Sequence, residues 1–228
     1  ATQRGFLDAG SLGSDRLNFL RGNRTLEGDT TTKPFRIRES RQGDIVNSQV
    51  WYVAQPVSNY SYKGYADFAK EHKNRLPMLY VGGNDGMLHG FSAVDGQEKL
   101  AYVPKGVMKN LPELAKPAYQ HIYFVDGSPF SGDINKGSDA SPNWRSLLVG
   151  SLGAGGKGYF ILDITKPGSH STITSGAVAN EFTKANASTL VVLDKTMHKE
   201  EVITPSTIDS NADIGNIFAE LSNLLQYS

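Results

Sequence analysis

The chain has 228 residues, with 23 Lys plus Arg against 23 Asp plus Glu and no cysteine. This charge balance argues against nucleic acid or an anionic membrane surface as a partner, since both attract basic proteins. The lack of cysteine excludes a disulfide framework and a thiolate zinc site, and no run approaches the roughly 18 apolar residues of a membrane-spanning helix, so we expect no transmembrane segment.

The N-terminal part predicts one short helix. Ser14 or Asp15 can cap it, and the apolar spacing that follows ends near Gly22. A polar connector over 29–34 comes next. Beyond it, the alternation in 35–40 predicts a strand, because apolar and polar residues that alternate place one face of a strand on a core.

The middle of the chain predicts a further strand, a helix and two hairpins. The β-branched and aromatic residues of 44–56 favour a strand, and the spacing in 64–75 favours a helix. Within 77–104, apolar runs flank Asn84-Asp85-Gly86 and then Asp95-Gly96. Such pairs suit type I′ turns, in which both central residues have positive φ, so we expect three successive antiparallel strands.

The C-terminal half predicts more strands. Residues 104–117 indicate an irregular helix broken at Pro112. About four further strand candidates follow at spacings typical of all-β folds. They lie within 121–134, 144–152, 158–165 and 188–196.

A glycine-rich loop separates two of these candidates. Residues Gly153 to Gly158 satisfy the G-x-G-x-x-G pattern, which binds a dinucleotide where a strand turns into a helix. Here Tyr159, Phe160 and Ile161 follow, and their composition is that of a strand. We therefore expect a hairpin loop rather than a nucleotide site, and no catalytic or cofactor-binding residues in it.

One acidic segment, 209–220, resembles a calcium loop. Oxygen ligands at its positions 1, 3, 5 and 12 can surround a hard cation, and these positions hold Asp209, Asn211, Asp213 and Glu220. The turn glycine is displaced by one position, however, and a solvated turn is the alternative. The five histidines show no zinc-binding spacing.

Five segments, taken in order, resemble the C-terminal domain of the PilC/PilY family of type IV pilus tip-associated proteins. They are "RLNFLRGN", "FRIRESRQGDIVNSQVWYV", "YVGGNDGMLHGFSAVDGQEKLAYVP", "HIYFVDGSPFSGDI" and "WRSLLVGSLGAGGKGYFILDIT", between residues 14 and 165. The resemblance implies a mainly β fold: a modified, partial β-propeller of antiparallel blades with short helical insertions. The length allows about three or four blades. We expect an N-terminal helix and connector over 1–33 and the propeller-type domain over 34–228.

The same resemblance implies a noncatalytic module for pilus biogenesis and adhesion. It implies minor pilins and a host-cell or surface receptor as partners, and export to the pilus tip, cell surface or outer membrane of a Gram-negative bacterium. Some members carry a regulatory calcium loop, for which 209–220 is the candidate here. Some carry an Arg-Gly-Asp adhesion tripeptide. The matching residues are Arg21, Gly22 and Asn23, without the carboxylate.

Two other functions stay open. The stretch "NDGMLHGFSAVDG" also resembles the repeat of quinone-dependent propeller dehydrogenases, although only Trp51 and Trp144 could supply the docking tryptophans of such blades. A surface propeller that binds glycans through exposed tyrosines is the other alternative.

Overall fold

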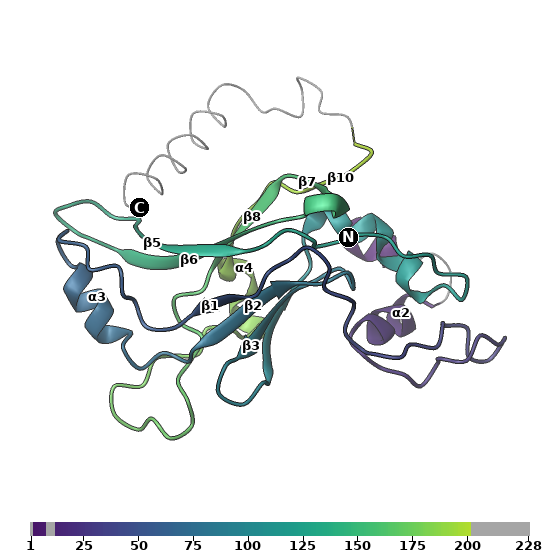
Figure 1. The fold of residues 1–228 in the computed structure, drawn as a ribbon, viewed down its shortest axis with the longest axis horizontal. Helices are drawn as coiled ribbons and strands as arrows, with labels where there is room; N and C mark the ends of the chain where they lie inside the picture. Colours follow the sequence, from purple (N-terminus) through teal and green to yellow (C-terminus); the bar gives the residue numbers. More distant parts are fainter. Residues whose placement is uncertain (1, 8–11, 202–228) are drawn as a thin grey trace.

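The computed structural model describes residues 2–7 and 12–201, and two four-stranded antiparallel sheets dominate it (Figure 1). The first sheet has the order β1-β2-β3-β4 and the second the order β5-β6-β8-β9, with a separate ribbon of β7 and β10. The strands are β1 (Trp51–Val53), β2 (Met78–Gly82), β3 (Leu88–Ser92), β4 (Glu98–Tyr102), β5 (Phe130–Asn135), β6 (Trp144–Ser151), β7 (Gly156–Lys157), β8 (Tyr159–Asp163), β9 (Val191–Asp194) and β10 (Met197–His198).

The helices are few and short, as predicted for insertions between strands. Figure 1 shows α3 at one end of the long axis and α2 near the other, with the sheets between them. The elements are α1 (Thr2–Leu7), α2 (Gly13–Leu20), α3 (Tyr65–Glu71), α4 (Ala187–Leu190) and the 3-10 helices η1 (Lys105–Ala115), η2 (Gly153–Gly155) and η3 (Lys184–Asn186). The mainly antiparallel β prediction is confirmed, but the described residues hold two four-stranded sheets instead of three or four.

The two predicted hairpins of the first sheet are confirmed, whereas their predicted turn type is wrong. Gly86 has φ 94° and Gly96 has φ 70°, but Asn84, Asp85 and Asp95 do not have positive φ. Both loops are longer than two residues, and loops of this length need only one residue in the left-handed region. Glycine takes that place because it has no Cβ to clash with the backbone.

Two other local predictions are wrong. Residues 35–40 form no strand: Phe35 is buried and makes one isolated bridge to Glu27, and the backbone N–H of Arg36 donates to the Ala115 carbonyl at 3.1 Å. The alternation of apolar and polar residues there arises because Phe35 is buried in the core, and not because the segment belongs to a sheet. The helix after residue 104 runs through Pro112 without a break, because the fixed φ of proline falls within the 3-10 range.

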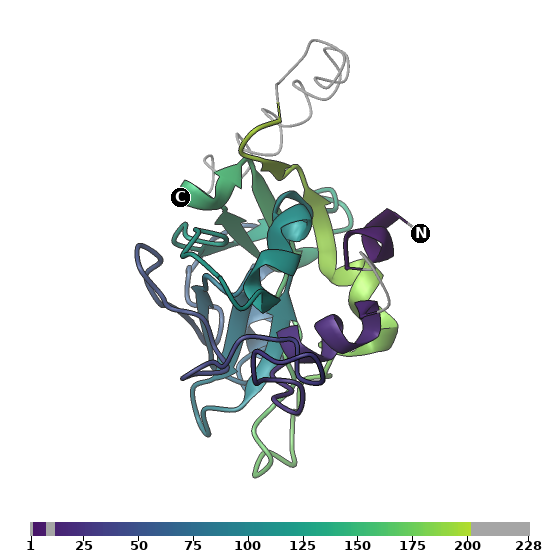
Figure 2. The ribbon, with the colours of Figure 1, turned by 90° about the vertical axis from the view of Figure 1, so that its right-hand side faces the viewer.

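One hydrophobic core lies between the two sheets and is closed by η1 and α2. Figure 2, viewed along the long axis, shows η1 and α2 in front of the sheets. Its members come from every part of the described chain and include Phe19, Leu20, Phe35, Met78, Tyr80, Leu88, Val107, Leu111, Phe124, Leu148, Phe160 and Leu162. Each buried side chain of this size stabilises the fold by about 1.5–3 kcal/mol. Phe19 and Leu20 thus join 1–33 to the same core, and the division at residue 34 stays a prediction.

The second sheet is apolar on both faces. Leu148 and Leu162 face the main core, whereas Leu147, Val149 and Ile161 form a separate buried cluster on the opposite face. A sheet with two apolar faces is typical of a layer that packs between two others, as a propeller blade does.

Candidate functional site

The predicted adhesion tripeptide forms the C-terminal cap of α2. Gly22 has φ 95°, and its N–H donates to the Phe19 carbonyl at 2.8 Å. The N–H of Asn23 donates to the Asn18 carbonyl at 2.9 Å. This pair of bonds is the Schellman motif, which requires a residue in the left-handed region after the helix. The glycine of the tripeptide therefore has a structural cause, and its adhesion role stays a prediction.

A buried ion pair holds this cap against the connector. Nε of Arg38 lies 2.7 Å from Oε1 of Glu27, and their side chains are only 6% and 5% exposed. The Arg38 guanidinium also donates to the carbonyls of Phe19 and Asn23, at 2.8 and 2.9 Å. Burial acts to raise the pKa of Glu27, but the hydrogen bonds from Arg38 and Arg24 outweigh it and lower the pKa. The residues on either side of the 29–34 connector are thus fixed to each other and to the end of α2 by charge-assisted bonds.

A groove of about 530 Å³ runs beside the cap, and we call it the cap groove. Arg21 and Gly22 from the cap, with Arg41 and Gln42, line it together with residues of the first sheet and its β2–β3 loop. These further residues are Asp85, Met87, His89, Phe91, Glu98 and Ala101, and Leu20 completes the lining. The structure therefore places two residues of the predicted tripeptide next to acidic groups that sequence spacing did not connect with them.

His89 lines the cap groove and bonds to two of its carboxylates. Its Nδ1 lies 2.6 Å from Oε1 of Glu98, and its Nε2 lies 3.0 Å from Oδ1 of Asp85. Oδ2 of Asp85 also accepts the N–H of Gly43 at 2.7 Å. Burial acts to lower the pKa of His89, but the two carboxylates outweigh burial and raise it. Because both ring nitrogens bond to carboxylates, the geometry favours the protonated form of His89, in which both nitrogens donate.

The cap groove offers cations and carboxylates side by side. The arginines Arg21 and Arg41 present guanidinium donors, while Asp85 and Glu98 present acceptors. Its other residues are apolar or amide-bearing, apart from His89. This chemistry suits noncovalent recognition of a polar protein segment.

The glycine-rich loop leads into a strand. After η2 and β7, the chain continues as β8, which pairs with β6 in antiparallel register from Ser151↔Tyr159 onward. The predicted hairpin is therefore confirmed. The glycine at position 155 has a steric cause, since a Cβ there would lie 1.8 Å from the Phe124 carbonyl oxygen.

The predicted calcium ligands Asp209, Asn211, Asp213 and Glu220 lie outside the described residues. Within residues 2–7 and 12–201, no three His, Asp or Glu side chains gather in a way that could hold a metal ion. In the same part of the chain, no helix has the length and apolarity that a membrane crossing requires.

Sequence reasoning missed a buried polar network that joins α3 to both sheets. Nη1 of Arg75 donates to the Ser146 hydroxyl at 2.7 Å, and that hydroxyl donates to Asp133 at 2.5 Å. The Tyr65 hydroxyl donates to the other carboxylate oxygen of Asp133 at 2.7 Å. The available signal was the pair of polar residues, Asp133 and Ser146, inside otherwise apolar strands.

Comparison with known proteins finds a family model described as the PilY1 beta-propeller domain, which matches residues 42–186, more than half of the chain. A type IV pilus biogenesis factor PilY1 homolog of Xylella fastidiosa is 46% identical over 164 residues, covering 69% of this chain and 13% of the relative. PilY1 of Pseudomonas aeruginosa strain PAK is 43% identical over 171 residues, covering 70% of this chain and 14% of that relative.

Among solved structures, the chain is similar to the Pseudomonas aeruginosa PilY1 C-terminal domain. The sequence identity is 39% and the TM-score is 0.37, over 50% of this chain and 22% of that one. The chain thus spans about a seventh of the length of the curated relatives that it matches.

Proposed function

The chain belongs to the PilY1 beta-propeller domain family, and we propose from this that it is a noncatalytic module of type IV pilus biogenesis. The observation that carries the proposal is the family match over residues 42–186, which spans every strand of both four-stranded sheets except β9. The relatives described above are named as type IV pilus biogenesis factors, which supports a noncatalytic role. The second sheet, apolar on both faces, supports a role as one layer of a larger propeller.

The location and partners follow from the same proposal. The chain is exported and acts at the pilus tip, the cell surface or the outer membrane of a Gram-negative bacterium. Its partners are minor pilins during assembly and a host-cell or surface receptor during adhesion. The cap groove supports protein recognition, because its paired arginines and carboxylates can match the charges on a partner segment.

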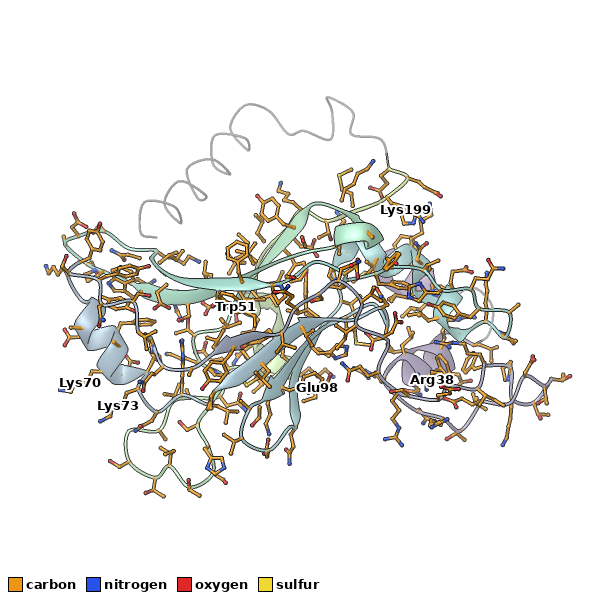
Figure 3. The ribbon with its side chains drawn as sticks, in the orientation of Figure 1. Arg38, Trp51, Lys70, Lys73, Glu98 and Lys199 are labelled. Carbon is orange, nitrogen blue, oxygen red and sulfur yellow. The ribbon has the colours of Figure 1, made fainter. Side chains whose placement is uncertain are left out.

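A binding experiment with purified minor pilins tests this proposal. We expect the immobilised chain to capture at least one minor pilin, and we expect Arg21→Ala with Arg41→Ala to weaken capture. The matched control is Lys70→Ala with Lys73→Ala. These two lysines lie in α3 and just after it, and their side chains point away from both sheets (Figure 3). Failure of the wild-type chain to capture any minor pilin would contradict the proposed function. Equal capture by both double variants would contradict only the assignment to the cap groove.

The calcium and adhesion proposals have separate tests. Ca²⁺ binding at Asp209, Asn211, Asp213 and Glu220 predicts heat release in a calcium titration that Asp209→Ala with Asp213→Ala abolishes. Adhesion through 21–23 predicts that Arg21→Ala lowers binding of the chain to host cells. Unchanged binding in either variant contradicts that site.

A further inference from the structure

A second pocket, of about 360 Å³, lies between α3 and the second sheet. We call it the α3 pocket. Three separate segments line it: α3 with the residue on either side, the start of β6 with the two residues before it, and the residues after β8. Its residues are Gly64, Asp67, Phe68, Glu71, His72, Pro142, Asn143, Trp144, Arg145, Thr165 and Lys166. The volume falls in the range of small-molecule sites.

His72 in this pocket has unmet hydrogen-bonding capacity. Its side chain is only 3% exposed, and in the described part of the chain its Nδ1 has no hydrogen-bond partner. Its Nε2 lies 3.9 Å from Oε1 of Glu71, which is too long for a hydrogen bond. A buried polar group without a partner is costly, and native structures contain few of them. His72 therefore places one unsatisfied, fully buried nitrogen in the wall of the α3 pocket.

His72 is held neutral. Burial lowers its pKa, and the positive charges of Arg75, Lys166 and Arg145 lower it further against the opposite effect of Glu71. A neutral imidazole carries one donor and one acceptor nitrogen, so it can bond a ligand hydroxyl or ammonium as well as a ligand carbonyl.

Arg145 in β6 and Lys166 just after β8 contribute two cations to the α3 pocket. Among residues 2–7 and 12–201, the nearest carboxylate to Arg145 is that of Asp163 at 3.7 Å, and the nearest to Lys166 is that of Glu181, also at 3.7 Å. Both distances exceed hydrogen-bond length. The side chains of Arg145 and Lys166 are 29% and 28% exposed, so a ligand can reach them. Together they offer a guanidinium fork and an ammonium, the usual partners of a carboxylate.

The helix contributes two acceptors. Asp67 and Glu71 are four residues apart, so they lie on the same face of α3. Glu71 is 67% exposed, and both residues line the pocket. The α3 pocket thus combines two carboxylates from the helix with two cations, one from β6 and one from the segment after β8.

An aromatic cluster fixes these two sides relative to each other. Trp144 is buried, and its indole N–H donates to the Lys63 carbonyl at 3.0 Å. Its ring contacts that of Tyr65 edge to face at 4.9 Å, and Phe68 belongs to the same cluster. Because α3 is anchored in this way to the start of β6, the charged groups are positioned before a ligand arrives.

We propose that the α3 pocket binds a small carboxylate that also carries hydroxyl or ammonium donors. The ligand carboxylate bonds to Arg145 and Lys166, its donors bond to Asp67 and Glu71, and one of its polar groups meets His72. Two sources share this chemistry: the uronic acid of a polysaccharide, and a free amino acid. The inference does not depend on the role of the chain in pilus biogenesis.

Titration calorimetry of the full 228-residue chain tests the proposal, with D-glucuronate, L-serine and uncharged D-glucose as probes. We expect glucuronate or serine to bind with a Kd of about 1 mM or tighter, and glucose to bind far more weakly. Binding of glucuronate alone identifies an acidic sugar as the ligand class, and binding of serine alone identifies an amino acid. No binding of either carboxylate, or equal binding of glucose, overturns the proposal.

Variants locate the binding. Arg145→Gln and Lys166→Gln should each weaken the carboxylate probe about tenfold, because each removes a charge-assisted hydrogen bond. Lys70→Gln is the matched control, since it removes one positive charge from the outer side of α3 and should leave the affinity unchanged (Figure 3). In nitrogen NMR, the imidazole signal that His72→Gln eliminates should shift when the probe is added. Circular dichroism checks that each variant is folded. Unchanged affinity in a folded Arg145→Gln variant overturns the proposal.

Discussion

Arg75 and Asp133 are joined through a single hydroxyl group, that of Ser146, in the interior of the protein. Arg75 precedes β2 of the first sheet, whereas Asp133 lies in β5 and Ser146 in β6 of the second. All three are buried. The guanidinium of Arg75 also donates to the carbonyl of Ala54, just after β1. This chain of bonds connects the two sheets at a point where apolar packing alone would not fix their relative position.

Arg75→Met should strongly destabilise the protein. The substitution keeps most of the side-chain volume but leaves Asp133 as a buried charge without its bridged cation. Breaking a buried ion pair on one side costs about 3–5 kcal/mol. Urea unfolding measures the change in the free energy of unfolding. Lys73→Met, at an exposed position nearby, should change it by less than about 0.5 kcal/mol. A similar small change for Arg75→Met would show that the network does not stabilise the fold.

Tyr65→Phe should lower the free energy of unfolding by about 1.5–3 kcal/mol, because the lost hydroxyl donates to a charged group. The Tyr65 hydroxyl bonds to Asp133 at 2.7 Å and accepts the N–H of Ser58 at 3.0 Å. Burial, together with the negative charge of Asp133, raises the pKa of Tyr65 to about 12. The contribution of Tyr65 to the free energy of unfolding is therefore complete below its unfolded pKa of about 10. It is lost as pH rises through the folded pKa. An ultraviolet titration of wild type and Tyr65→Phe checks this assignment. It would be contradicted if the tyrosine missing from the variant titrated at or below about pH 10, the ordinary tyrosine pKa.

His89 should make stability depend on pH near neutrality. Because its folded pKa is raised, its contribution is complete below the unfolded pKa of about 6.5 and is lost as pH rises through the folded pKa. The stability difference between wild type and His89→Gln should therefore be larger at about pH 6 than at about pH 9. Glu98→Gln should lower the pKa of His89 in an NMR titration. A difference that does not vary with pH would mean that His89 has the same pKa in the folded and the unfolded protein.

Gly22→Ala should destabilise the cap of α2. At φ 95°, alanine is strained by about 1–2 kcal/mol, and its Cβ would lie 3.4 Å from Cδ of Arg41. Gly5→Ala is the matched control, because a Cβ at Gly5 in α1 would have no neighbour within 4 Å and alanine favours a helix. Thermal unfolding compares the two variants. Equal melting temperatures would show that the left-handed cap is not needed.

Local sequence signals predicted the elements whose structure is set by neighbouring residues. Gly86 and Gly96 mark loops that the chain needs wherever β2, β3 and β4 are placed, so both hairpins were predicted. The strand prediction for 35–40 failed for the opposite reason. Phe35 is held by the core and Arg36 by the Ala115 carbonyl, nearly eighty residues away, and no local pattern reveals such a partner.

The candidate sites depend on the fold in the same way. Arg21 and Gly22 were singled out from the sequence, but Asp85 and Glu98 reach them only because the β2–β3–β4 meander passes beside the end of α2. In the α3 pocket, His72 belongs to a predicted helix, while Arg145 in β6 and Lys166 just after β8 are distant in sequence. In each case the sequence showed the type of the residue, but it did not show which residues would lie beside it in the fold.

In-frame deletion of residues 42–186 from the encoding gene tests the central claim most directly. The measurement is the amount of pilin sheared from the cell surface, relative to total cellular pilin, with the deleted protein confirmed by immunoblot. A pilus biogenesis module predicts that sheared pilin falls sharply while total pilin is unchanged, and that the wild-type gene restores it. Surface pilin at the wild-type level in cells that make only the deleted protein would contradict the account.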